Sequence, residues 1–147
     1  MTDPGVTLDS QLCFAIYGAA HAFTRAYKPL LEPLGLTYPQ YLVMLALWET
    51  DVQPVKAIGT ALGLDSGTLS PLLKRLEQSG FVTRTRDTKD ERQVRIALTA
   101  KGTALRPQAL HIMQAIGQAS GCGFEEMVRL RDGLRTVQGN LAAASDS

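Results

Sequence analysis

The chain is poor in the residues that build metal centres and disulfide frameworks. Its 147 residues include two cysteines, Cys13 and Cys122, and two histidines, His21 and His111. Neither cysteine belongs to a CxxC pair, so the sequence predicts no zinc site, and no cofactor is expected. In a reducing compartment, two such distant cysteines are not expected to form a permanent structural disulfide.

Long apolar runs are also missing. No stretch approaches the ~18 apolar residues that a membrane helix needs, so we expect no contact with a membrane. The first residues, MTDPGVTLDS, lack the basic and apolar regions of a signal peptide. The expected location is therefore the cytoplasm.

The chain has no large excess of charge of either sign. A net charge of +1 excludes a polybasic nucleic-acid binder in which the whole surface is cationic. The charge is unevenly distributed, however: residues 74–106 contain nine Lys and Arg against four Asp and Glu, whereas residues 1–73 contain three against six. A positive patch confined to one segment is typical of a local phosphate-facing surface.

Two short helices with a tight turn are predicted over residues 54–78. Val55, Ile58 and Leu62 recur at helical spacing, and Gly63 can end that helix in a left-handed conformation. Asp65 can cap a second helix, expected to begin near residue 66 so that Pro71 lies close to its first turn. Leucines at positions 69, 72, 73 and 76 give this second helix one apolar face.

After residue 80 the apolar period changes from 3.6 to 2. Residues 81–86 and 94–98 are predicted strands, joined by the polar turn 87–93. Helix, turn, helix and a charged hairpin together predict a mostly α fold with a small β-wing, a winged helix-turn-helix.

The polar residues of this unit suit DNA. Hydroxyls and cations on the second helix can bond base edges and phosphates in a major groove, and arginines on the hairpin suit a minor groove. The candidates are Ser66, Thr68, Ser70, Lys74, Arg75, Arg84, Arg86, Lys89, Arg92 and Arg95. The alternative is a solvated charged hairpin on an ordinary α+β domain.

Three further amphipathic helices are predicted outside the winged unit. We expect residues 1–147 to form one domain, with a DNA-binding lobe at 37–99 and long helices at 7–27 and 101–143 that are interrupted at 121–123. These long helices exceed what one winged unit needs, so we expect them to form a dimerisation domain with a second copy. The alternative is a monomer with a helical cap.

The cysteines occupy different settings. Cys13 lies one helical turn before Tyr17 and shares its face, and Tyr27 and Tyr38 lie near helix ends. Phenol donors favour a thiolate. Cys122 lies between two glycines, where we expect an exposed, mobile corner. The pair suits peroxide oxidation followed by a disulfide, whereas the plainer interpretation of Cys13 is a small buried apolar residue.

The run from 8 to 49, LDSQLCFAIYGAAHAFTRAYKPLLEPLGLTYPQYLVMLALWE, closely resembles the organic-hydroperoxide-sensing branch of the MarR family of repressors. The wing sequence DERQVR, followed by LTAKG, resembles the family's DxR…LTxxG signature. The likeness covers residues 8–106 well and the last two helices only in pattern.

The resemblance implies a homodimeric repressor on pseudo-palindromic double-stranded operator DNA. It implies that an organic hydroperoxide oxidises Cys13 to a sulfenic acid, that Tyr17, Tyr27 and Tyr38 hydrogen-bond the sensing thiol, and that Cys122 of the partner subunit resolves the sulfenic acid. Tyr27 and Tyr38 are expected from the partner subunit. Arg92 is expected to enter a minor groove, oriented by Asp90.

Other functions stay open. A repressor of this family can instead respond to a small phenolic or apolar ligand, and Cys13→Ser would then keep its response. A sensor of hypochlorite or of thiol oxidants in general would differ in its oxidant. A thiol peroxidase would consume peroxide catalytically, but the basic wing argues against an enzyme.

Overall fold

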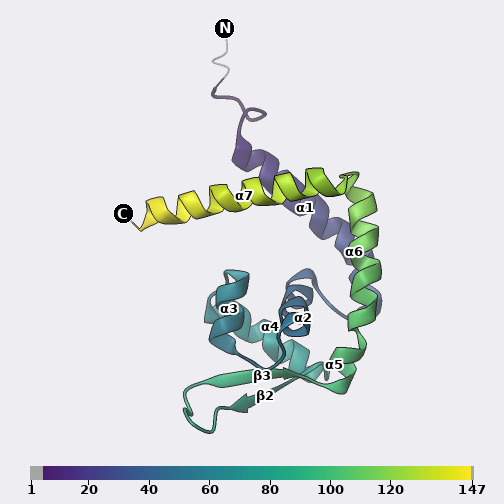
Figure 1. Ribbon diagram of the computed structural model, residues 1–147, viewed down its shortest axis with the longest axis vertical. Helices are drawn as coiled ribbons and strands as arrows, with labels where there is room; N and C mark the ends of the chain where they lie inside the picture. Colours follow the sequence, from purple (N-terminus) through teal and green to yellow (C-terminus); the bar gives the residue numbers. More distant parts are fainter. Residues whose placement is uncertain (1–4, 147) are drawn as a thin grey trace. The chain divides into compact units, whose positions relative to one another are not determined.

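The computed structural model describes residues 5–146. These form two compact units, of which the first ends at Ile112 and the second begins at Met113. The chain is mostly helical with one small sheet (Figure 1). In order, the elements are α1 (Leu12–Leu31), η1 (Glu32–Leu34), α2 (Tyr38–Glu49), β1 (Gln53–Pro54), α3 (Val55–Leu62), α4 (Ser66–Gln78), β2 (Val82–Arg86), β3 (Val94–Leu98), α5 (Ala100–Ala104), α6 (Arg106–Ser120) and α7 (Phe124–Ser145).

The core of the first unit is built on α2. The Thr37 hydroxyl accepts a hydrogen bond from the Gln40 N–H, while the Gln40 side chain accepts one from the Thr37 N–H, and this reciprocal box fixes where α2 begins. Val43, Met44 and Leu47 are fully buried. Helix α2 contacts both α3 and α4, so it lies beneath the helix-turn-helix.

Helices α3 and α4 form the predicted helix-turn-helix. Gly63 ends α3 in the left-handed region, with a φ of 69°. The Asp65 carboxylate caps α4 by accepting the Thr68 N–H at 2.7 Å, which lowers the pKa of that carboxyl. Leu69, Leu73 and Leu76 bury one face of α4.

The wing is a sheet of three strands rather than two. The order is β1-β3-β2, all antiparallel, with Arg84 opposite Ile96 in the hairpin and Gln53 opposite Ile96 on the other side. The expected strands are confirmed, except that β2 begins at Val82 because Phe81 still bonds the end of α4. Sequence reasoning missed β1, which is too short to show any alternation.

The base of the wing is held by a close backbone approach at Gly102. A Cβ at this position would lie 2.1 Å from the carbonyl oxygen of Phe81, so only glycine fits. The Gly102 carbonyl accepts a hydrogen bond from Trp48 Nε1 at 3.1 Å. This contact joins the end of α2 to the segment that follows β3.

Both ends of the first helix differ from the sequence-based expectation. The first helix begins at Leu12 rather than 7, because Thr7 and Ser10 exchange side chain to backbone hydrogen bonds in a preceding turn. It continues through Pro29, which is exposed, so water can satisfy the carbonyl that loses its donor. Helix α4 begins at Ser66, as expected, and Pro71 lies just after its first turn.

The expected single helix over 101–120 is two helices. Pro107 has no N–H to continue the hydrogen-bond ladder from α5, so α5 ends at Ala104 and α6 begins at Arg106 with proline in its first turn. The second unit consists of the end of α6 and α7, which reaches Ser145 rather than 143.

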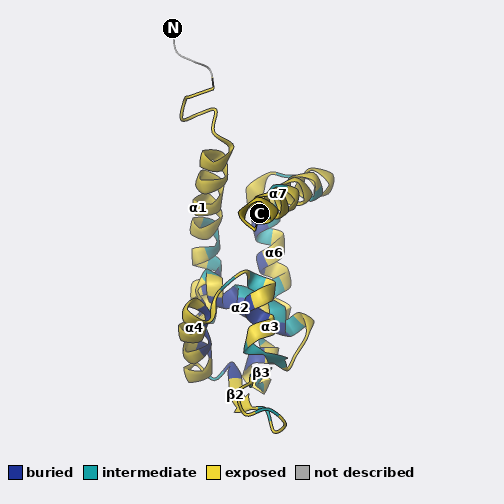
Figure 2. Cartoon of the chain, turned by 90° about the vertical axis from the view of Figure 1, so that its left-hand side faces the viewer, coloured by how far each residue is buried: buried dark blue, intermediate teal, exposed yellow. Residues whose placement is uncertain are grey.

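Large apolar residues stay exposed on α1 and α7, which are coloured mostly as exposed in Figure 2. On α1, Leu12 is 59% and Phe23 43% exposed, and on α7, Leu130 is 53% and Leu141 64% exposed. The apolar faces of α1 and α7 are therefore uncovered within one chain, which is the condition of a surface that packs against another molecule, whereas Ile112 and Ile116 of α6 are buried.

Candidate DNA-binding surface and cysteine sites

The outer face of α4 presents the predicted polar residues together. Its apolar side is buried in the unit, so the opposite side is open to solvent. All five predicted contact residues on this helix are exposed: Ser66, Thr68, Ser70, Lys74 and Arg75. The hydroxyls occupy the first two turns, the part of a recognition helix that meets base edges in a major groove.

Arg84 of the wing is not a free cation. Its Nε lies 3.5 Å from Oε1 of Glu77 on α4, and both side chains are about two-fifths exposed. This ion pair connects the base of the hairpin to the recognition helix. A surface pair of this kind adds little stability, so its main consequence is to restrict where the Arg84 guanidinium can reach.

The wing tip is ordered by two aspartates. Oδ1 of Asp87 accepts the Lys89 N–H at 2.8 Å, and Oδ2 accepts Arg95 Nε at 3.0 Å. These bonds hold the pKa of Asp87 below its usual range, the Lys89 bond contributing most. Arg95 is half-buried, so it braces the hairpin rather than presenting its charge to a partner.

Asp90 organises the other side of the tip. Its Oδ1 accepts the Arg92 N–H at 3.1 Å and lies 3.5 Å from the Arg92 Nε. The Arg92 side chain is 94% exposed. Arg86 is also exposed and donates from Nη1 to the Glu91 carbonyl at 3.2 Å. The tip therefore projects one guanidinium fully into solvent on a backbone that Asp90 stiffens.

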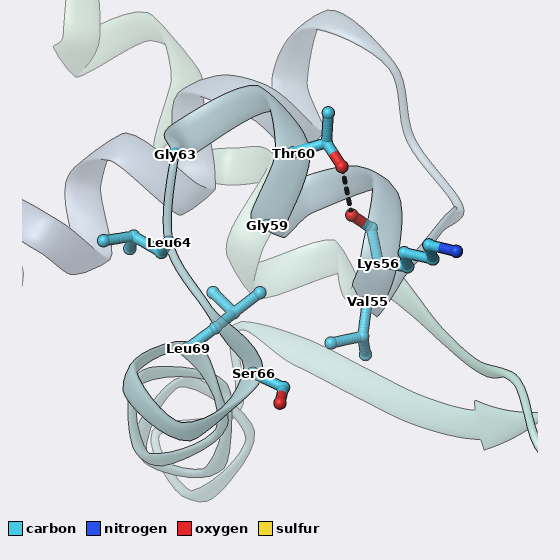
Figure 3. A pocket seen from close by; sticks show the side chains of 8 residues that line it. All are labelled: Val55, Lys56, Gly59, Thr60, Gly63, Leu64, Ser66 and Leu69. Carbon is cyan, nitrogen blue, oxygen red and sulfur yellow. Dashed lines mark hydrogen bonds between the residues drawn. The ribbon is translucent and has the colours of Figure 1, made fainter. Parts of the chain in front are cut away.

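A hollow of about 500 Å³ lies between α3 and the start of α4 (Figure 3). Val55, Gly59, Leu64 and Leu69 give it an apolar lining, while the Lys56 ammonium points away from these side chains. A small-molecule site needs a few converging polar groups to orient its ligand. Thr60 and Ser66 also line this hollow, but the Thr60 hydroxyl already donates to the Lys56 carbonyl, so the hollow lacks a converging polar set and is a packing feature of the helix-turn-helix.

Cys13 lies in the first turn of α1 and is exposed, which contradicts the interpretation as a buried apolar residue within its own chain. Tyr17 is one turn further along and is 63% exposed. The Tyr17 ring packs edge-on against His21, with centroids 4.4 Å apart and ring planes at 68°. Sequence reasoning missed His21, although its i+4 spacing from Tyr17 signals a shared face.

Tyr27 and Tyr38 meet in the structure. Their ring centroids are 4.8 Å apart, and Tyr41, a residue that sequence reasoning did not select, lies 5.8 Å from Tyr27. Burial, together with the neighbouring phenols Tyr38 and Tyr41, raises the pKa of Tyr27 to about 12. Burial also raises the pKa of Tyr38. Both phenols thus stay protonated, so their O–H groups remain donors at neutral pH.

This tyrosine pair does not reach the cysteine of the same chain. Cys13 and Tyr27 lie on one continuous helix, and a rise of about 1.5 Å per residue places them roughly 21 Å apart along its axis. Of the three predicted tyrosines, only Tyr17 lies within about one helical turn of the Cys13 of its own chain.

Cys122 lies in the second unit, between α6 and α7. It is half-buried rather than fully exposed as expected, and Gly121 before it has a φ of 70°. Its N–H donates to Ser120 Oγ at 3.2 Å, and its thiol donates to the Ser120 carbonyl at 3.8 Å. Within residues 5–146, no group of three His, Cys, Asp or Glu side chains could hold a metal ion, and no helix is long and apolar enough to cross a membrane.

A second pocket, of about 370 Å³, lies between α1 and the start of α2. Tyr38 and Leu36 line it, Arg25 and Lys28 supply cationic groups, and Glu32 supplies one carboxylate. Apolar walls with a few polar groups are the usual composition of a small-molecule site.

Comparison with protein families agrees with this architecture. The family described as "Transcriptional regulator SarA/Rot" matches residues 25–106, more than half of the chain. A curated relative, the HTH-type transcriptional regulator TtmR of Methylorubrum extorquens (strain PA1), is 52% identical over 145 residues, which cover 99% of this chain and 74% of TtmR.

Two further relatives relate this fold to redox chemistry and DNA. The organic hydroperoxide resistance transcriptional regulator of Bacillus subtilis (strain 168) is 46% identical over 130 residues, 88% of each chain. AbfR of Staphylococcus epidermidis, solved in its reduced form bound to DNA, is 39% identical with a TM-score of 0.77, covering 92% of this chain and 94% of AbfR. AbfR has also been solved in a disulfide form, with a TM-score of 0.66 and 41% identity over 88% of this chain and 91% of AbfR.

Proposed function

Because the chain belongs to the MarR/SarA-type winged-helix family of DNA-binding transcriptional regulators, we propose that it is a homodimeric, cytoplasmic repressor that senses organic hydroperoxides through Cys13. The observation that carries the proposal is the Tyr27–Tyr38 pair. Tyr27 lies about 21 Å along α1 from the Cys13 of its own chain, on a helix whose apolar face is uncovered, and Tyr38 packs against Tyr27 from the start of α2.

A two-fold dimer accounts for both the distance between Tyr27 and Cys13 and the uncovered apolar helix faces. It covers the exposed apolar residues of α1, α6 and α7, and it allows Tyr27 and Tyr38 of one subunit to approach Cys13 of the other. It also presents two α4 helices to successive major grooves, which matches a pseudo-palindromic operator. The wings then bring Arg92 to the flanking minor grooves, with Asp90 fixing the backbone that carries it.

The sensing reaction follows from thiol chemistry. The Cys13 thiolate attacks the outer oxygen of the hydroperoxide, the O–O bond breaks, and the leaving alkoxide takes a proton, so Cys–SH and ROOH give Cys–SOH and ROH. In the proposed dimer, Tyr17, Tyr27 and Tyr38 donate hydrogen bonds to the thiolate and to the peroxide oxygens. Condensation with the partner's Cys122 then forms a disulfide and releases one water.

Release of DNA needs only a modest free-energy difference. A hundredfold loss of operator affinity corresponds to about 2.7 kcal/mol between the reduced and oxidised dimers. Forming the disulfide requires the two Cα atoms to approach within roughly 4.4–6.8 Å. We propose that this movement of the outer helices shifts the two α4 helices out of register with successive grooves. The disulfide form of AbfR supports such chemistry on this fold.

The proposal is tested with an operator selected from random duplex DNA by the reduced protein. Gel shifts before and after one equivalent of cumene hydroperoxide are paired with non-reducing electrophoresis. We expect loss of binding and a reducible dimer band, both absent in Cys13→Ser. Cys122→Ser should lose the band and keep its operator binding after oxidation, because no disulfide then moves the outer helices. Unchanged binding of the unmodified protein after complete oxidation of its Cys13 would contradict the proposal.

A second candidate is a repressor released by a small phenolic or apolar ligand. The 370 Å³ pocket beside Tyr38 favours it, because Arg25 and Lys28 could hold an acidic group there. This function predicts that Cys13→Ser responds to its inducer like the unmodified protein. The same gel shift, repeated with Cys13→Ser, separates the two functions. A sensor of hypochlorite would instead be recognised by faster reaction of Cys13 with that oxidant.

A further inference from the structure

We propose that His21 is a positioning residue for the sensing reaction: its ring holds the Tyr17 phenol over the Cys13 thiol, and so sets the rate at which hydroperoxides oxidise that thiol. The inference rests on the proposed function, because it assumes that Cys13 is the sensor. It adds a residue that neither the wing and cysteine motifs nor the tyrosine pattern includes.

The three residues form one line along α1. Cys13, Tyr17 and His21 follow each other at four-residue spacing, so they share one helix face. Side chains on a helix lean toward its N-terminus and cover the preceding turn. His21 therefore leans onto Tyr17, and Tyr17 leans toward Cys13, in the direction that the reaction requires.

The contact between the two rings is the observation that carries the proposal. Their centroids lie 4.4 Å apart at an interplanar angle of 68°, an edge-to-face arrangement that aromatic pairs prefer. Tyr17 is 63% exposed, so its own surroundings restrict its rotamers weakly. The His21 ring selects one of these rotamers. Tyr17 is thereby ordered before the hydroperoxide arrives.

An ordered phenol matters because hydrogen bonds to a thiolate favour the reactive charged form. Tyr17 belongs to the same chain as the Cys13 it faces, whereas Tyr27 and Tyr38 need the second copy. His21 thus supports the donor that is present whatever the state of the interface. Its effect on oxidation should pass entirely through the Tyr17 hydroxyl.

The experiment measures the second-order rate constant for oxidation of Cys13 by cumene hydroperoxide, in full-length reduced protein carrying Cys122→Ser. The sulfenic acid is trapped with dimedone and quantified by mass spectrometry. We expect His21→Ala to slow the reaction roughly three- to tenfold, the range that one aromatic pair commonly spans. His21→Phe keeps an aromatic edge and should restore most of the rate.

Two controls separate a positioning role from a general loss of structure. His111→Ala makes the same substitution at the other histidine, which is exposed on α6, and should leave the rate unchanged. Combining His21→Ala with Tyr17→Phe should slow oxidation no more than Tyr17→Phe does alone. Thermal unfolding and gel filtration verify that each variant keeps its fold and oligomeric state.

The outcomes are distinguishable. Equal rates for the unmodified protein and His21→Ala, with Cys13 still oxidised, would overturn the role of His21 and leave the proposed function standing. Equal losses in His21→Phe and His21→Ala, or additive losses in the double variant, would also overturn it. Failure of Cys13 to react in the unmodified protein would instead refute the proposed function.

Discussion

Replacing Arg92 by alanine should weaken DNA binding strongly while leaving the fold almost unchanged. The Arg92 side chain is 94% exposed, and its ion pair with Asp90 spans 3.5 Å in solvent. Exposed substitutions of this kind change the free energy of unfolding by about 0.5 kcal/mol or less. The stability of the variant should therefore match that of the unmodified protein.

The effect on DNA affinity follows from the two copies of Arg92 that a dimer carries. One arginine in a groove contributes about 1–3 kcal/mol to binding, and the substitution removes it from both wings. The free energy of operator binding should therefore weaken by roughly 2–6 kcal/mol, which raises the dissociation constant about 30-fold to 10⁴-fold. Asp90→Asn should weaken binding less, because an amide oxygen can still accept the Arg92 N–H.

Fluorescence anisotropy with labelled operator at several salt concentrations measures this effect, and urea unfolding measures stability. Arg131→Ala is the matched control, since Arg131 forms an exposed ion pair with Asp132 at 3.2 Å, on α7, outside the winged unit. Its operator affinity should stay within about twofold. An Arg92→Ala affinity equal to that of the control would refute the assignment of the wing tip to DNA.

Three further predictions concern the fold. Gly102→Ala should lower the free energy of unfolding by about 1–3 kcal/mol, because its Cβ would meet the Phe81 carbonyl oxygen at 2.1 Å. In Gly139→Ala the added Cβ meets nothing within 4 Å, so this control should raise the free energy of unfolding by about 0.5–1 kcal/mol. Equal effects of the two substitutions in urea titrations would contradict this. Trp48→Phe should lower the free energy of unfolding by about 1–3 kcal/mol, because the Gly102 carbonyl loses the donor that lies 3.1 Å away. An unchanged midpoint of urea unfolding would contradict this. Since folding raises the pKa of Tyr27 to about 12, its contribution to stability is complete below pH 10 and is lost as the pH rises through 12; Tyr27→Phe should flatten this alkaline decline in thermal melts, and a decline of equal steepness would refute the cause.

The recognition unit could be predicted because its signals are local. Asp65 caps α4 and Gly63 ends α3 through backbone geometry within a few residues, and both are readable from residue type. The same holds for α2, where Thr37 and Gln40 form their box. The charged residues of the hairpin could be counted in the sequence, but the ion pairs that they form could not be predicted from it. Arg95 and Arg84 look like free cations in the sequence, and only the folded wing brings them to Asp87 and Glu77.

The sensing residues also divide into those that local spacing predicts and those whose placement depends on packing. Spacing along one helix placed Tyr17 beside Cys13, and the same spacing would have indicated His21. Tyr27 and Tyr38 meet across a turn that contains Pro33 and Gly35, and the closeness of their rings depends on how α2 packs against α1. Tyr41 was missed because its role depends on that packing.

By itself the sequence determined the order of the helices, the helix-turn-helix and the hairpin, because caps, turns and apolar periods act over one or two turns of chain. Tertiary structure alone decided that the two-residue β1 completes the sheet, that Gly102 touches Phe81, and that the apolar faces of α1 and α7 remain uncovered. These features join segments far apart in the chain. Their free energies arise from packing and backbone pairing that no local pattern encodes.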